Sequence, residues 1–184
     1  MVIQRSGVFI FSCLVFLGCG SQETKLEEVK PDNKSEKEAL VYPYTAKYST
    51  NWVQGDEKNA VLVLESFKKY HDGDVKGTFT YFADSVEFIS DRFYFKGNKD
   101  SLETLITSVR ANDATLSFEP DGWVTIYYPD QDDTWVTVWG MQRWTDKKGI
   151  ADSAYIKNDF VVKKGKITKV DEKWRQFEAV KRKK

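Results

Sequence analysis

The chain has 184 residues, and its 28 basic and 28 acidic side chains give a formal net charge of zero. This balance excludes the strongly basic surface typical of nucleic-acid binding, so we expect no nucleic-acid partner. Both cysteines, Cys13 and Cys19, lie in the amino-terminal export pattern, so one histidine and no free cysteine remain, which cannot assemble a zinc site. The sequence also has neither a nucleophile elbow nor a glycine-rich phosphate loop. We therefore expect no metal and no cofactor.

The amino-terminal residues have the pattern of an export signal. Arg5 precedes an apolar run from Val8 to Leu17, which ends in Gly18-Cys19. The run is shorter than the roughly twenty residues needed to cross a bilayer, which favours a cleaved signal peptide over residues 1–18. Leu17-Gly18-Cys19 resembles a bacterial lipobox. That resemblance implies an acylated Cys19 and a protein anchored in the bacterial cell envelope, at the outer membrane and facing either the periplasm or the surface. The alternative is an ordinary signal that leaves Cys19 as a free thiol.

The segment after the signal is highly charged. Between Gly20 and Leu40 there is no aromatic residue, and glutamate, lysine, aspartate and serine dominate. Such a segment buries too little apolar surface to offset the entropy cost of ordering it. We interpret residues 19–41 as a flexible tether, with a charged helix as the alternative. A folded domain is then expected over 42–178, followed by a basic tail over 179–184.

Helical periodicity recurs in the first half of the domain. Asp56 is a candidate N-cap for a helix that runs to Tyr70, and further helices are predicted over Val75–Phe82 and Asn98–Arg110, the latter with Asn98 as its candidate N-cap. His71 lies at the end of the first helix beside lysines, where positive charge is favourable. This position favours a structural role for His71 over a catalytic one.

One run carries a family resemblance: Tyr81-Phe82-Ala83-Asp84-Ser85-Val86-Glu87-Phe88, then Phe95-Lys96-Gly97 and a helix opening on Ser101-Leu102. It is similar to a run of the nuclear transport factor 2-like superfamily, which includes polyketide cyclases and steroid isomerases. The chain resembles most closely the bacterial lipoprotein branch of unknown function. The resemblance implies an α+β domain in which three helices pack on the concave face of a curved antiparallel sheet and close a conical pocket. Phe88 stands where the isomerase branch has a catalytic aspartate, so isomerase chemistry is not implied.

The second half of the domain is predicted to be strand, over Thr115–Tyr128, Trp135–Trp144, Ser153–Val162 and Ile167–Phe177. A three-residue loop with Gly165 in the left-handed conformation would join the last two strands. It would place three pairs opposite each other: Ile156 with Trp174, Asn158 with Glu172, and Phe160 with Val170. Because this register sets apolar against apolar residues, a slip by one residue is disfavoured.

The same parity sorts the large side chains onto two faces. Trp135, Trp139 and Tyr155 fall on the face opposite to Asn158 and Phe160. A sheet that is apolar on both faces needs two covers, and helices can cover only one of them. In the superfamily the convex side commonly meets a second copy, so we predict a homodimer built on these three aromatic residues. The alternative is that lysine and arginine stems half cover them.

The inner face predicts a ligand site, because a few polar groups converge within an apolar cone. Its predicted ligand-binding residues are Gln142, Trp144, Asn158, Phe160, Glu172 and Trp174. Glu172 is the one catalytic candidate, since a carboxyl among aromatic rings has a raised pKa and can exchange protons near neutral pH. A hydrogen-bonded Glu172-Asn158 core pair, or a Glu172 that pairs with a lysine at the rim, is the structural alternative. Three functions remain open: binding a small apolar ligand, a structural or partner-binding dimer with a filled cone, and proton-transfer catalysis. We favour binding over an enzyme.

Overall fold

The computed structural model of the protein describes residues 41–176, and its compact unit begins at Tyr44. The predicted signal peptide over 1–18, the acylation site at Cys19, nearly all of the tether and the tail over 179–184 lie outside the described residues. Within the described part, no helix is long and apolar enough to cross a membrane.

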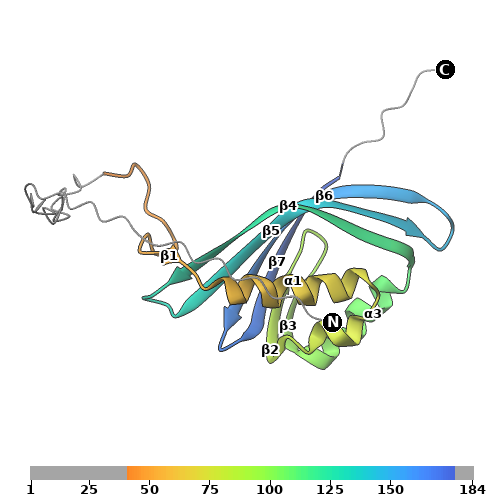
Figure 1. The fold of residues 1–184 in the computed structure, drawn as a ribbon, viewed down its shortest axis with the longest axis horizontal. Helices are drawn as coiled ribbons and strands as arrows, with labels where there is room; N and C mark the ends of the chain where they lie inside the picture. Colours follow the sequence, from red (N-terminus) through yellow and green to blue (C-terminus); the bar gives the residue numbers. More distant parts are fainter. Residues whose placement is uncertain (1–40, 177–184) are drawn as a thin grey trace, which may run out of the picture. The chain divides into compact units, whose positions relative to one another are not determined.

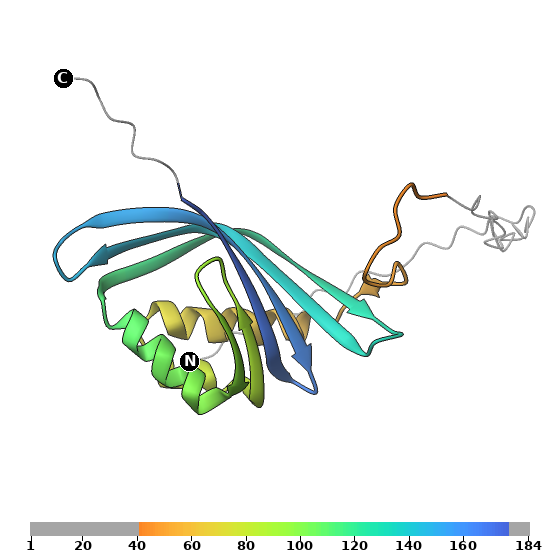
Figure 2. The same ribbon diagram turned by 180° about the vertical axis from the view of Figure 1, so that it is seen from behind.

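The compact unit is an α+β domain with three helices and one curved sheet of seven strands that does not close (Figure 1). In chain order, its elements are β1 (Val53–Gln54), α1 (Glu57–His71), α2 (Val75–Phe79), β2 (Phe82–Ile89), β3 (Tyr94–Asn98), α3 (Lys99–Arg110), β4 (Asp113–Tyr128), β5 (Asp133–Asp146), β6 (Ala151–Lys163) and β7 (Lys166–Gln176). The strand order across the sheet is β1-β4-β5-β6-β7-β2-β3. Seen from behind, the long strands bend over the helices (Figure 2).

The sheet is mixed, which corrects the prediction of an antiparallel sheet. β2 pairs in parallel with β7, with Phe82 opposite Ile167 and Phe88 opposite Val170. The other neighbouring strands are antiparallel. Antiparallel hairpins follow from local turn residues, whereas this parallel pair joins segments from opposite ends of the domain. No local pattern in the sequence marks such a pair.

The helix starts follow the predicted caps. The Asp56 carboxylate accepts a hydrogen bond from the backbone N–H of Lys58 at 2.9 Å, and the Asn98 side chain accepts one from Asp100 at 2.7 Å. Each satisfies a donor that the first turn of a helix leaves free. The second helix is shorter than predicted: it ends at Phe79, because Phe82 already pairs with β7.

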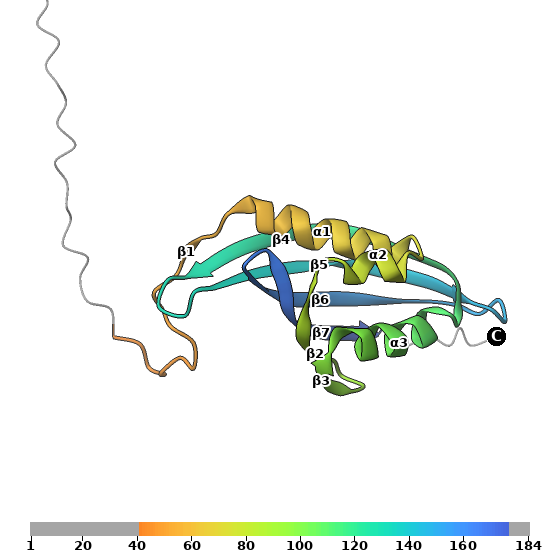
Figure 3. The same ribbon diagram turned by 90° about the horizontal axis from the view of Figure 1, so that it is seen from below.

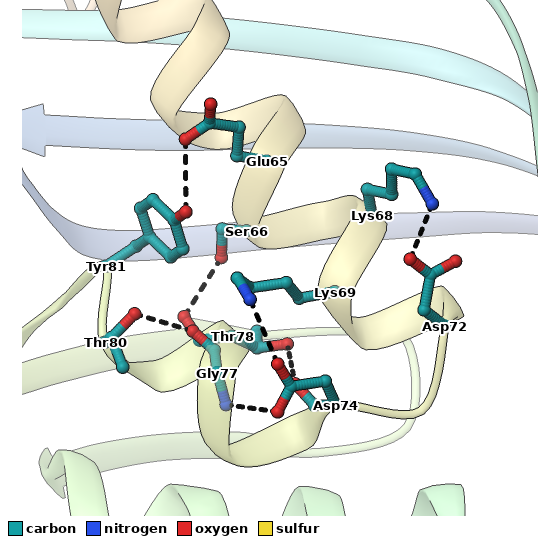
Figure 4. Close-up of polar contacts among 10 residues, drawn as sticks. All are labelled: Glu65, Ser66, Lys68, Lys69, Asp72, Asp74, Gly77, Thr78, Thr80 and Tyr81. Atoms are coloured by element: carbon teal, nitrogen blue, oxygen red, sulfur yellow. Dashed lines mark hydrogen bonds and ion pairs between the residues drawn. The ribbon is translucent and has the colours of Figure 1, made fainter.

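Polar contacts fix α2 against α1 (Figure 4). The buried Ser66 hydroxyl donates to the carbonyl of Thr78 at 3.2 Å. Lys69 and Asp74 form an ion pair at 3.0 Å, and the Tyr81 hydroxyl donates to Glu65 at 3.1 Å. These contacts hold the two helices at a fixed angle, so the side chains that they present to the sheet have defined positions.

The predicted register of the last hairpin is confirmed. Ile156 lies opposite Trp174, Asn158 opposite Glu172, and Phe160 opposite Val170. The length of the turn differs from the prediction. The turn has two residues, Lys164 (φ 50°) and Gly165 (φ 70°), and both are left-handed. A register shift next to the turn supplies the extra residue that the predicted three-residue loop would have contained.

The core lies between the helices and one face of the sheet. α1 packs on β4 and β5, while α3 packs on β2 and β3 (Figure 3). Fully buried residues of the helices and sheet form one apolar cluster that includes Ala60, Val63, Leu102, Val136 and Val138. Val136 and Val138 share the face of Phe160 and Asn158, so the predicted inner face of the sheet is the one that faces this cluster.

Candidate functional site

A cavity of about 390 Å³ lies between the helices and the sheet. The six residues predicted from the sequence line it together, from three neighbouring strands: Gln142 and Trp144 of β5, Asn158 and Phe160 of β6, and Glu172 and Trp174 of β7. The Trp144 and Trp174 rings meet edge to face at 5.7 Å. The volume falls within the range of small-molecule sites.

The rest of the lining comes from the helices, β2, the turn between β2 and β3, β4 and β7, and the sequence did not single it out. Most of these residues are apolar or aromatic: Phe67, Tyr70, Phe79, Phe82, Phe88, Phe93, Ile106, Val109 and Leu116. Phe67 and Tyr70 belong to the apolar face of α1, which the helical spacing did identify. The helical spacing of apolar residues identifies the buried face of a helix, but it does not show which residues of that face border a cavity.

Glu172 is the central polar residue of the site. Burial away from water raises the pKa of its carboxyl above the ordinary value, while hydrogen bonds from Trp174 and Asn158 and the nearby charge of Arg92 oppose that rise. The negative charge of Asp91 adds to it. The predicted contact between Glu172 and Asn158 is therefore present. Glu172 also lines the cavity, where an occupant can reach its carboxyl.

Asn158 leaves one buried acceptor free. Its side chain is 2% exposed, and its Oδ1 has no hydrogen-bond partner among the described residues. Because the amide group donates to Glu172, the amide nitrogen is the atom turned toward that carboxyl. A buried acceptor without a partner costs folding free energy, so such groups normally bind water or a ligand.

His71 is buried beneath the cavity wall and holds Gln142. Its Nδ1 lies 2.8 Å from the carbonyl oxygen of Phe67, and its Nε2 lies 3.0 Å from the side-chain oxygen Oε1 of Gln142. Burial lowers the pKa of His71, while the hydrogen bonds to the Phe67 carbonyl and the Gln142 oxygen oppose that fall. His71 is a positioning residue, consistent with its predicted structural role.

A second carboxyl, Asp113, lines the cavity near Tyr70. Burial raises the pKa of Asp113, and the charge of Arg110 opposes the rise. Arg110 also donates to three carbonyl oxygens, those of Tyr70 (3.3 Å), His71 (3.3 Å) and Asp113 (3.1 Å). It therefore ties the end of α1 to the start of β4, the junction at which Tyr70 and Asp113 meet the cavity.

The turn between β2 and β3 closes one side of the cavity against Trp174. The Arg92 guanidinium lies 5.2 Å from the centre of the Trp174 ring, and the Asp91 carboxylate accepts the Trp174 backbone N–H at 3.0 Å. Phe88 and Phe93 stack in parallel at 5.2 Å in the same hairpin. Nothing local in the sequence connects this turn with β7. Within the described residues, no group of three or more metal-ligating side chains is placed to hold an ion.

The predicted dimer residues lie on the opposite face of the sheet. Trp135, Trp139 and Tyr155 are partly buried by their own chain. Tyr48 meets the Trp135 ring edge to face at 5.2 Å. The Tyr155 hydroxyl donates to Asp121 at 2.6 Å, and the Arg175 guanidinium lies over the Tyr155 ring.

No protein-family model matches the sequence. No curated protein matches it either. Solved structures do resemble it. A nuclear transport factor 2-like protein from Burkholderia xenovorans LB400 superposes with a TM-score of 0.53 at 20% identity, over 67% of this chain and 93% of that one. A candidate dehydratase of the same family from Streptomyces avermitilis gives 0.57 at 11% identity, over 66% and 97%.

An LEH-like epoxide hydrolase from M. tuberculosis also superposes, with a TM-score of 0.52 at 12% identity, over 64% of this chain and 84% of that one. The chain therefore has the nuclear transport factor 2-like fold, as the resemblance predicted. At such identities the shared feature is the fold. What the cavity does must be argued from its own side chains.

Proposed function

We propose that this domain binds a small, mainly apolar ligand in the cavity between its helices and the sheet. The observation that carries the proposal is the combination of an aromatic cavity of about 390 Å³ with a buried, unpartnered acceptor, Asn158 Oδ1. A domain whose sheet served only as a dimer surface would be more stable with the cavity filled and that oxygen replaced by an apolar group. The open cavity supports binding over the filled cone.

The experiment is a titration with the uncharged fluorescent dye N-phenylnaphthylamine, compared between two tryptophan variants. Val109 lines the cavity and is 51% exposed, whereas Val61 lies on α1 away from the lining and is 55% exposed. Val109→Trp places a large ring at the cavity wall, and Val61→Trp adds the same ring elsewhere. We expect V109W to weaken dye binding about tenfold or more, which is about 1.4 kcal/mol, and V61W to leave it unchanged.

Equal weakening in both variants, or in neither, would show that the dye binds outside the cavity. Circular dichroism and the urea midpoint of each variant check that its fold is intact. Because the two valines are matched in exposure and both lie on helices, any general effect of an added surface tryptophan cancels in the comparison.

A second candidate function is proton-transfer catalysis of the isomerase, cyclase or dehydratase type. Its supporting observation is Glu172, a carboxyl with a pKa raised by burial, within the electrostatic reach of the Tyr70 hydroxyl. If Glu172 is the catalytic acid or base, Glu172→Gln should abolish turnover of an enolisable ketone while dye binding persists. Unchanged turnover in E172Q would exclude Glu172 as the acid or base.

We also propose that the protein is exported and anchored in the cell envelope through an acylated Cys19, as the sequence pattern indicates. Mass spectrometry of the protein extracted from membranes should find the lipid on Cys19. Cys19→Ala should move the protein from the membrane fraction to the soluble one. Membrane retention of C19A, or an unmodified thiol in the wild type, would contradict the anchor.

The homodimer remains a proposal as well, built on Trp135, Trp139 and Tyr155. Its support is that these three aromatic residues lie on one face of the sheet and are only partly buried by their own chain. Sedimentation equilibrium should give twice the monomer mass, and Trp139→Glu should return it to the monomer mass. A wild type that sediments as a monomer would contradict the proposal.

A further inference from the structure

The serine and threonine hydroxyls around the cavity have no proton left for a ligand. The Ser66 hydroxyl donates to the carbonyl of Thr78, the Thr78 hydroxyl to the carbonyl of Asp74, and the Ser90 hydroxyl to the carbonyl of Phe93, at 3.2, 3.0 and 3.4 Å. The first two oxygens hold their helices together and the third closes the β2–β3 turn. An occupant therefore meets few donors from these side chains.

Three acceptors remain available beside them. Asn158 Oδ1 is buried and unpartnered, and the carboxyl of Glu172 lies directly across the β6–β7 pair from it. Tyr70 lines the cavity within electrostatic reach of Glu172, and burial raises the pKa of its hydroxyl, so it stays a neutral phenol whose oxygen can accept. Acceptors from α1, β6 and β7 thus line the same cavity.

The charges around the cavity are also in acidic excess. Glu172 and Asp113 line the cavity with a single cation, Arg92. Outside the lining, the charges of Asp91 and Arg110 act on Glu172 and Asp113 respectively, and Asp146 adds negative charge beside Asp113. Four carboxyls therefore face two guanidinium groups, and one of these, Arg110, is already bound to three main-chain carbonyls.

The aromatic lining can hold a cation. The Arg92 guanidinium already stands over the Trp174 ring at 5.2 Å, and Trp144 meets Trp174 edge to face. Aromatic faces attract cations most strongly where water is excluded. The same rings supply apolar contact for the body of a ligand.

We infer that the ligand of this cavity is an organic amine in its protonated form, with the ammonium group between Glu172, Asn158 Oδ1 and Tyr70 and the apolar body among the aromatic rings. An ammonium has three donors and no acceptor, so these three acceptors of the cavity lining can satisfy it. This inference rests on the proposed binding function and names its ligand class. Since an ammonium favours the ionised carboxylate, binding lowers the pKa that burial raises at Glu172, releases whatever proton the carboxyl holds at the pH of the titration, and strengthens as that carboxyl ionises.

The test uses three indole compounds of closely similar size that differ in the terminal group: tryptamine, tryptophol and indolepropionate. Isothermal titration calorimetry of the whole purified protein at neutral pH should give tryptamine at least about tenfold tighter binding than tryptophol, and indolepropionate the weakest. Repeating the tryptamine titration in buffers of different ionisation enthalpy measures the released proton. Glu172→Gln should remove both the preference and the proton release, while the exposed Glu119→Gln should keep both.

Tryptophol or indolepropionate binding as tightly as tryptamine would overturn the inference, as would a preference that survives unchanged in E172Q. If none of the three compounds binds while N-phenylnaphthylamine does, the amine class is wrong and the proposed binding function stands. If the dye does not bind either, the binding function itself fails. The wild-type proton release needs no variant, so the test holds even if E172Q does not fold.

Discussion

Replacing Glu172 by glutamine tests whether its carboxyl is a buried, titrating group. Glutamine has nearly the same shape, and its carbonyl can still accept the hydrogen bonds that Trp174 and Asn158 donate. The substitution removes the ionisable proton and the charge. Any change in the pH dependence of stability then reports on that proton.

The sign follows from the direction of the pKa shift. The folded state holds the Glu172 pKa above its ordinary value of 4.5, chiefly because burial penalises the charged carboxylate. As the pH rises above 4.5, the unfolded chain therefore loses this proton before the folded protein does. The wild type loses stability through that window and then levels off once the folded carboxyl has also ionised.

The magnitude is about 1.4 kcal/mol for each unit by which the folded pKa exceeds the unfolded one. The cavity reaches the carboxyl, so water and the nearby Arg92 limit the total cost. In E172Q this contribution is absent. We therefore expect E172Q to be more stable than the wild type at pH 8 by about 1 kcal/mol or more, and to lose this advantage as the pH falls toward 4.

The assay is urea denaturation followed by tryptophan fluorescence, at a series of pH values from 4 to 9. Glu119→Gln is the control, because Glu119 is exposed and its pair with Arg143 at 2.9 Å lies on the surface, where such pairs contribute little. A variant E172Q whose stability runs parallel to the wild type at all pH values would refute the reasoning. The carboxyl would then be ionised in both states, and the positive charge of Arg92 would outweigh its burial.

Three further substitutions test the framework of the site. Leu102→Ala, at a position with no exposure, should lower the free energy of unfolding by about 2–5 kcal/mol, whereas Leu105→Ala, at a position 47% exposed, should change it by less than about 1 kcal/mol, both read from urea midpoints. Arg110→Gln removes hydrogen bonds to three carbonyls and should cost about 2 kcal/mol, against about 0.5 kcal/mol for Arg143→Gln at an exposed pair. Gly140→Ala would place a Cβ in steric conflict with a main-chain oxygen of β4, so the β4–β5 pair should be weakened. Hydrogen exchange of the amides in this pair should then be faster than in the wild type. Unchanged exchange would mean that the two strands accommodate the added Cβ without losing stability.

The sequence itself determined the local features of this protein. Asp56 and Asn98 cap helices as predicted, because an N-cap depends only on the next few residues. The pairing of Asn158 with Glu172 was predictable too, since a short turn and period-two alternation fix both register and facing. From that facing alone, six residues of the cavity wall could be named together.

Only the tertiary structure decided what stands opposite that wall. The parallel pairing of β2 with β7, the contact of His71 with Gln142 across 71 residues and the approach of Arg92 to Trp174 all join distant segments. Periodicity shows that a residue is buried, but it carries no information about its partner across the core. Those partners are determined when the helices and the sheet pack together to exclude water. The excess of carboxyl groups around the cavity and the free oxygen of Asn158 can therefore be seen only in the folded domain.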